Sequence, residues 1–186
     1  VFSNHDVIRH ATRYGLPKKT NFEKWVMTDG NSPELDREKG QSRARAATML
    51  LLALPGSTYL YQGEELGLPE HTTLADEFRQ DPTFYRTAGK RVGRDGCRVP
   101  LPWESGLGSA NGFNRTGHAW LPQPEIYAEY ARDRQEGVEG STLELYRKAL
   151  KLRKGLVTDE KLKWVKHPFN KNVVHFVRPN GWTCVT

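Results

Sequence analysis

Side chains suited to binding a ligand lie at the very start of the chain. The apolar pair Val1-Phe2 is followed, after Ser3, by the polar triplet Asn4-His5-Asp6. An amide, an imidazole and a carboxylate in succession can both donate and accept hydrogen bonds, which suits a polar ligand. The alternative is a turn in which these polar side chains satisfy one another. Because the apolar pair stops so abruptly, we expect Val1 to Ser3 to be the end of a strand, and the sequence to be a piece of a larger protein.

A second polar cluster follows a second apolar run. Ser57 to Tyr61 is rich in β-branched and aromatic residues, so we predict a buried strand that ends at Gln62-Gly63-Glu64-Glu65. Adjacent side chains on an extended segment point in opposite directions. We therefore expect Glu64 and Glu65 to make structural hydrogen bonds and not to act as a catalytic pair.

The remaining elements must position these clusters. We predict helices over residues 35–54 and from Ser141 to about Gly155, the second opened by the capping-box pattern of Ser141 and Glu144. Residues 173–177 and 182–185 are predicted to form a β-hairpin around Pro179-Asn180-Gly181. Residues 66–140 contain no convincing long element, and a loop of that length is usually functional.

The order of these elements favours an α/β fold. Strand, helix, strand and helix in succession are typical of a parallel α/β unit. Barrel enzymes place their sites at the carboxyl ends of the strands. We therefore expect the segments 4–6 and 62–65 to lie side by side.

Composition narrows the class of protein. With 186 residues, 37% of them hydrophobic and 27% charged, the chain is typical of a globular protein. The longest apolar run, Met49 to Leu54, is far shorter than the ~20 residues of a membrane span. The net charge of +6 comes from Lys and Arg interleaved with Asp and Glu. We therefore expect neither a nucleic-acid nor a membrane partner.

The two cysteines suggest no redox or metal chemistry. Cys97 and Cys184 are far apart and match no metal-binding or redox spacing. We interpret them as reduced thiols of a cytoplasmic protein, and we expect no metal and no cofactor.

Three segments together resemble one enzyme family. Residues 1–6 resemble the fourth sequence signature of the α-amylase family, glycoside hydrolase family 13. Residues 54–65 resemble its motif at the eighth barrel strand, and Gly93 to Trp103 resembles a segment of α-glucosidases and oligo-1,6-glucosidases. The resemblance implies that residues 1–165 are the last part, strands 7–8 with their helices, of a (β/α)8 TIM barrel. Residues 166–186 would then begin a C-terminal β-sandwich.

The resemblance also implies an activity. The parent protein would be a retaining α-glucosidase that hydrolyses terminal glucose from α-glucosidic oligosaccharides. The family's nucleophile and acid/base cannot be placed on this sequence, so we expect the chain to be inactive alone. The alternatives are a transglycosylating relative, of the trehalose synthase or sucrose-cleaving type, and a non-catalytic carbohydrate-binding module. Because strand edges would be left unpaired, we also expect self-association.

The resemblance assigns roles to individual residues. Asp6 would stabilise the oxocarbenium-like transition state, because hydrogen bonds to the sugar strengthen as charge develops. His5 and Arg94 would bind the substrate, Arg94 through a planar fork that suits paired oxygen atoms. Arg13 and Tyr14 are candidates for the entrance, with an ordinary loop role as the alternative. The alternative role for Arg94 is to brace the loop by pairing with Asp95 or Glu104. For Arg98, such a bracing role is the one that we expect.

Overall fold

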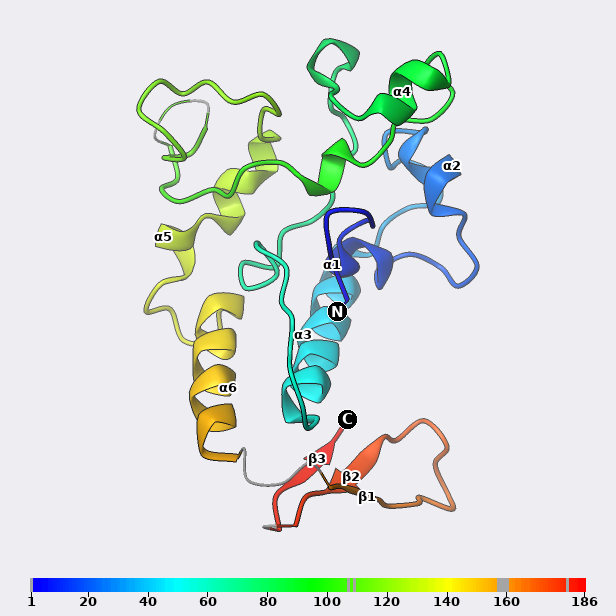
Figure 1. Cartoon of the computed structure of the whole chain (residues 1–186), viewed down its shortest axis with the longest axis vertical. Coiled ribbons are helices and arrows are strands. Elements are labelled where there is room, and N and C mark those ends of the chain that lie inside the picture. Colours follow the sequence, from blue (N-terminus) through cyan, green and yellow to red (C-terminus); the bar gives the residue numbers. More distant parts are fainter. Residues whose placement is uncertain (1, 107, 109, 157–160, 180) are drawn as a thin grey trace.

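Two long helices form the middle of the molecule. The computed structural model describes residues 2–106, 108, 110–156, 161–179 and 181–186. Helices α3 (Arg37–Ala53) and α6 (Thr142–Leu156) lie side by side, with loops and short helices at one end and a small sheet at the other (Figure 1). The shorter elements are α1 (His10–Arg13), α2 (Phe22–Val26), η1 (Asp76–Phe78), α4 (Pro82–Arg86), η2 (Asp95–Cys97), η3 (Glu125–Tyr130), α5 (Arg132–Gln135), β1 (Lys163–Trp164), β2 (His175–Val177) and β3 (Thr183–Val185).

The predicted long helix over residues 35–54 is confirmed as α3. Its N-cap residue Asp36 accepts a hydrogen bond from the backbone N of Lys39 at 3.0 Å, which satisfies one of the unpaired donors of the first turn. Gly40 faces α1, where an added Cβ would lie only 2.2 Å from the carbonyl oxygen of Ala11. A residue without a side chain at this position therefore lets α1, which follows the polar triplet, pack closely against α3.

The second predicted helix is confirmed as α6. Ser141 Oγ accepts a hydrogen bond from the backbone N of Glu144, as the capping-box pattern predicts. The Glu144 carboxylate accepts from the backbone N of Gly137. Two polar contacts then fix α6 against α3, from Gln41 to Thr142 and between Thr48 and Tyr146, each at 2.8 Å.

The C-terminal hairpin is also confirmed. β2 and β3 pair antiparallel with Phe176 opposite Cys184, and Asn180 of the predicted turn lies outside the described residues. A strand that we did not predict, β1, pairs with the other edge of β2 and places Trp164 opposite Phe176. The antiparallel sheet thus starts at residue 163, and the domain boundary at residues 165 and 166 stays a prediction.

The two parallel strands are not formed, so this part of the prediction is wrong. Phe2 and Ser3 belong to no strand, Asn4 makes only an isolated bridge with Val7, and Val1 lies outside the described residues. Residues 57–61 run beside α3 without pairing (Figure 1), and Tyr59 is 70% exposed. A parallel strand gains its hydrogen bonds from neighbouring strands, and none of the described strands lies beside this segment. Its backbone therefore has no strand partner among the described residues, and self-association through it stays a prediction.

The largest buried cluster among the described residues is formed mainly by side chains of the long loop of residues 66–140. It contains Leu66, Leu68, Leu74, Val99, Leu121, Tyr127 and Leu143. As predicted, the described part of that loop contains short helices and no long element. Within the described residues, none of the helices combines the length and apolar character needed to cross a bilayer.

Candidate functional site

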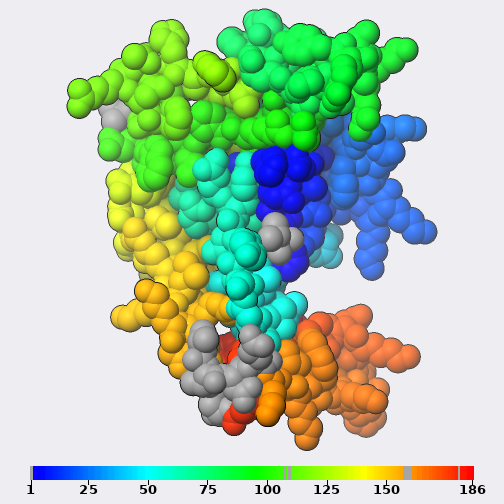
Figure 2. Space-filling model, viewed as in Figure 1, coloured from blue at the N-terminus to red at the C-terminus, as the bar shows by residue number. Residues whose placement is uncertain are grey.

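One buried arginine joins the three segments singled out in the sequence. Arg9, only 1% exposed, lies three residues after Asp6. Its Nη1 donates to the carbonyl oxygen of Gln62 and its Nη2 to that of Cys97, both at 2.9 Å. The chain just after the triplet, the 62–65 segment and the segment from Gly93 to Trp103 therefore meet around one side chain. In Figure 2 the dark blue N-terminal residues lie directly against the green part of the chain above them.

The two glutamates of the 62–65 segment have structural roles, as predicted. Glu64 Oε1 accepts a hydrogen bond from the backbone N of Ser3 at 3.1 Å. Glu65 Oε2 accepts from the backbone N of Gly63 at 2.8 Å. The first of these bonds places Ser3, directly before the triplet, against the 62–65 segment, although neither segment follows a strand.

Asp6 lies between two arginines and a histidine. Its Oδ1 is 2.7 Å from Arg94 Nη1 and 3.3 Å from Arg98 Nη2, and its Oδ2 is 3.3 Å from His5 Nε2. The hydrogen bond from Arg94 is the main reason that the pKa of Asp6 is lowered. The Asp6 side chain is 47% exposed, so an ionised carboxylate is presented to a ligand arriving from solvent.

Sequence reasoning missed the residue that anchors Arg94. Asp81 is fully buried, and its Oδ2 lies 2.5 Å from Arg94 Nε and 2.9 Å from Arg94 N. Arg94 thus bridges a buried and an exposed carboxylate, and its pKa is raised by both. Arg94 pairs with Asp81 and Asp6, so the alternative prediction that it pairs with Asp95 or Glu104 is wrong. Asp95 instead accepts hydrogen bonds from the backbone N of Gln80 and of Asp81.

A local sequence signal for Asp81 was available. Asp81 precedes Pro82 and caps α4 by accepting from the backbone N of Thr83 at 2.9 Å. Asp before Pro is a frequent helix start. Gly93 completes the arrangement, because its φ is +77° and a Cβ there would lie 2.7 Å from Asp81 Cβ. The glycine before Arg94 therefore allows the two loops to touch.

Arg98 has a bracing role, but through the triplet and not through the expected partners Asp95 and Glu104. Its Nε donates to the carbonyl oxygen of His5 at 2.8 Å. Together with its contact to Asp6, this bond fixes the backbone of the triplet to the segment that carries Arg94. The His5 side chain itself is 68% exposed and points away from the buried interior.

A pocket of about 420 Å³ opens beside Asp6. Arg13 and Arg94 line it together with Asp6, so the structure brings three of the predicted site residues to one pocket. His5 is held beside Asp6 but does not line this pocket. Tyr14 does not line it either, because its ring packs against Phe2 and His10. The entrance roles of Arg13 and Tyr14 stay predictions.

A buried carboxyl group close by is kept away from this pocket. Burial raises the pKa of Glu64 to about 7. Glu64 lines a separate cavity of about 10 Å³, room for one water molecule, together with Ser3 and His10. A ligand beside Asp6 therefore has no direct access to the Glu64 proton.

The raised pKa of Glu64 predicts a pH dependence of stability. The native state keeps the Glu64 proton up to about pH 7, whereas the unfolded chain releases it near ~4.3. This group therefore weakens the native state as pH rises through that window. Replacing it, as Glu64→Gln, is expected to add stability relative to the unsubstituted chain on the order of 3 kcal/mol at pH 7 and almost none at pH 4. Urea unfolding of both proteins at the two pH values measures this difference, and a difference independent of pH would contradict it.

Comparison with known proteins identifies the family of this chain. The model of the α-amylase catalytic domain matches residues 1–160. The chain belongs to the α-amylase family.

Individual relatives are consistent with this assignment. A probable α-glucosidase of Rhizobium meliloti is 35% identical over 154 residues, which are 83% of this chain and 24% of that protein. Maltase A1 of Drosophila melanogaster is 28% identical over 72% of this chain and 23% of its own length. The chain thus spans about a quarter of the curated relatives that it matches.

Solved structures share the arrangement of elements. An α-glucosyl transfer enzyme, XgtA, superposes with a TM-score of 0.70 and 32% identity, over 95% of this chain and 28% of that one. The trehalulose synthase MutB superposes with a TM-score of 0.69 over 99% of this chain and 33% of its own, at 22% identity, which supports the fold alone. The chain is therefore part of an α-amylase-type catalytic domain, with helices and a small antiparallel sheet.

Proposed function

We propose that this chain supplies the sugar-holding part of a retaining α-glucosidase. In this proposal residues 1–165 are the end of the catalytic barrel domain, and residues 166–186 begin a β-sandwich. Asp6 stabilises the positive charge that develops on the glucose ring, while His5 and Arg94 hold its hydroxyl groups. The substrate is a terminal glucose unit in an α-glucosidic oligosaccharide.

One observation supports this proposal most strongly. Asp6 is ionised, half-exposed and fixed by Arg94, which is itself held by the buried Asp81. A carboxylate oriented before the substrate arrives can stabilise a developing cation without having to reorganise. The partly exposed fork of Arg94 is close enough to share the same sugar unit.

The chain on its own is proposed to bind and not to hydrolyse. A retaining glycosidase needs a nucleophile and an acid/base in addition to a stabilising group. The raised pKa of Glu64 would suit a general acid. Glu64 is buried, however, where it accepts a hydrogen bond from the backbone N of Ser3, and it lines a cavity other than the pocket beside Asp6. Asp81 is fully buried and occupied by Arg94.

Glucosyl transfer is the second candidate activity. The similarity to XgtA, at 32% identity over nearly the whole chain, favours it. Transfer and hydrolysis share the glucosyl intermediate and differ only in the acceptor, so the roles proposed for Asp6, His5 and Arg94 hold for both.

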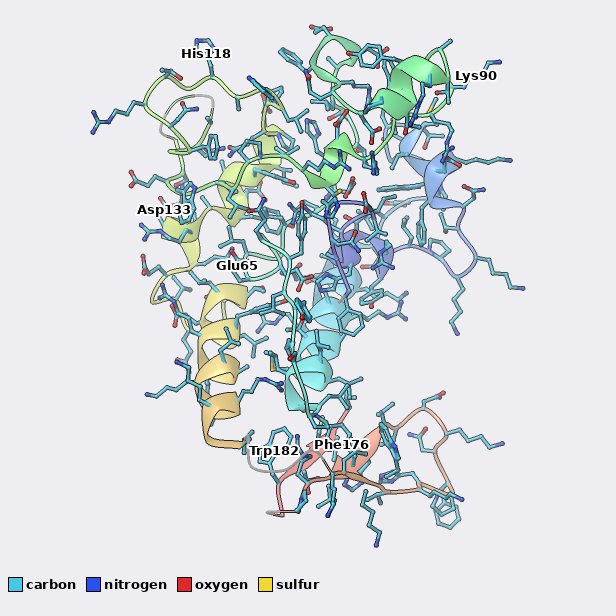
Figure 3. The ribbon with its side chains drawn as sticks, in the orientation of Figure 1. Glu65, Lys90, His118, Asp133, Phe176 and Trp182 are labelled. Carbon is cyan, nitrogen blue, oxygen red and sulfur yellow. The ribbon has the colours of Figure 1, made fainter. Side chains whose placement is uncertain are left out.

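The binding proposal is tested by titrating the purified chain with methyl α-glucoside and following the backbone amide signals by NMR. Shifts are expected at His5, Asp6 and Arg94, and the change Asp6→Ala is expected to abolish them. Asp133→Ala is the matched control, since Asp133 accepts a hydrogen bond from Ser105 and belongs to α5, which lies away from α4 (Figures 1 and 3). The chain is expected to cleave a chromogenic α-glucoside no faster than buffer. Binding unaffected by Asp6→Ala, or clear turnover, would contradict the proposal.

A further inference from the structure

Two arginines lie between the same two carboxylates. Arg94 contacts Asp6 through Nη1 at 2.7 Å and Asp81 through Nε at 2.5 Å. Arg98 contacts Asp6 through Nη2 at 3.3 Å, and its Nη1 lies 3.9 Å from Asp81 Oδ2. Within the described part of the chain, neither arginine forms a salt bridge with another carboxylate. The four side chains are therefore one ion-pair cluster, in which two positive charges are balanced by two negative charges.

The two carboxylates of this cluster differ in exposure. The Asp6 side chain is open to solvent, whereas the Asp81 side chain is fully buried. The hydrogen bond from Arg94 is the main reason that the pKa of Asp81 is lowered, so Asp81 is ionised at pH 7. A buried charge is screened by salt much less than an exposed charge. Asp81 thus acts on the site as a fixed negative charge behind the two arginines.

The neighbouring carboxylate of Asp95 does not have this role. Asp95 is buried as well, but its Oδ2 accepts hydrogen bonds from the backbone N of Gln80 and of Asp81. These donors are uncharged peptide groups. Of the two buried carboxylates, Asp81 is the one that pairs with the guanidinium groups beside Asp6.

The charge of Asp81 matters for any cation that lies beside Asp6. Without Asp81, such a cation would meet two arginines and one carboxylate, and the sum of these charges is positive. With Asp81 the four charges add up to zero, so repulsion from the arginines no longer outweighs the attraction of Asp6. Asp81 also holds the Nε edge of Arg94, which leaves Nη1 for Asp6.

We infer that Asp81 is a positioning residue that makes the site at Asp6 selective for a positively charged sugar ring. Asp81 acts through Arg94 and Arg98, whose charge it balances and whose guanidinium groups it holds, and it does not touch the ligand. This inference rests on the proposed function, because it takes the sugar to be held at Asp6 and the positive charge to develop there.

Two ligands test the inference by calorimetry on the purified chain at pH 7. Isofagomine is a piperidine analogue of glucose whose ring nitrogen is protonated at this pH, and methyl α-glucoside is uncharged. Asp81→Asn keeps the shape of the side chain and removes its charge. It is expected to lower the ratio of the isofagomine affinity to the methyl α-glucoside affinity about tenfold, the order expected for one unit charge acting across a partly solvated site. A purely structural role would weaken both ligands alike, and the unchanged ratio would overturn the inference.

Arg98→Gln is a second variant with the opposite expected effect. It leaves the cluster with a negative sum of charges, so the affinity ratio is expected to rise severalfold. Loss of the bracing by Arg98 affects both ligands alike and cancels in the ratio. Because this variant keeps Asp81, the test stays decisive if Asp81→Asn does not fold. An affinity ratio that does not rise in Arg98→Gln would overturn the inference.

The matched control is Asp133→Asn, which removes a carboxylate that binds Ser105 and lies outside the cluster. It is expected to leave both affinities unchanged, and a ratio that falls as far as in Asp81→Asn would overturn the inference. If both ligands bind and only the ratio fails to respond, glucose binding at Asp6 remains intact. If neither ligand binds the unsubstituted chain, the proposed function and the inference are overturned together.

Discussion

Asp81→Ala is expected to lower the free energy of unfolding by about 3 kcal/mol. The Asp81 carboxylate is buried and accepts hydrogen bonds from the backbone N of Thr83 and from both the backbone and the side chain of Arg94. Loss of a helix cap costs about 1 kcal/mol, and loss of a charged hydrogen bond about 2 kcal/mol more. Urea unfolding at pH 7 measures the sum.

The variant Asp81→Asn separates the two contributions. Asparagine also caps helices well, so α4 is expected to keep its start while the charge on Arg94 loses its buried partner. The hydrogen bond from Arg94 lowers the pKa of Asp81 below its usual range. The stabilisation is therefore complete above the unfolded pKa of ~3.9 and is lost as pH falls through the lower native pKa.

The difference between the unsubstituted chain and Asp81→Asn should accordingly shrink as the solution is acidified below about pH 4. A difference that stays constant down to pH 2 would show that the charge of Asp81 contributes nothing. An Asp81→Ala variant as stable as the unsubstituted chain would show that α4 and Arg94 do not depend on this carboxylate.

Asp6→Ala is expected to reduce turnover on the order of 10²-fold in an active α-glucosidase that carries these residues. The reason is that Asp6 acts on charge that exists only in the transition state, and removing one such group has an effect of this size. Steady-state kinetics with an aryl α-glucoside separate kcat from KM. Asp133→Ala serves as the control, because Asp133 contacts Ser105 on a different loop. A rise in KM with unchanged kcat would assign Asp6 to ground-state binding only.

The sequence predicted those parts of the molecule whose signals are local. The helix of residues 37–53 and the helix after Ser141 follow from periodicity and caps that a few neighbouring residues specify. The hairpin of β2 and β3 follows from a turn between two short apolar runs. The resemblance of residues 1–6 and 93–103 to family motifs brought Asp6 and Arg94 to attention, and the structure places them 2.7 Å apart.

The failures involve contacts between distant segments. Residues 57–61 have a strand composition, but a parallel strand exists only where neighbours pair with it, and composition does not report neighbours. The sequence indicates that Asp81 caps a helix. Its second role, which is to hold Arg94, depends on a residue 13 positions further along the chain. Nothing in the types of Tyr14 and Arg13 indicates that only Arg13 reaches the pocket, because that depends on how Phe2 and His10 pack.

Arg9 ties together segments of the candidate site that are far apart in the sequence. Its guanidinium joins carbonyl groups that lie 53 and 88 positions further along the chain. Loops tied at such long range cannot open one at a time without exposing the same buried cation, so they unfold as a single cooperative unit. A glucoside held at Asp6 should therefore slow hydrogen exchange at Gly63 and Cys97 as well as at its own contacts.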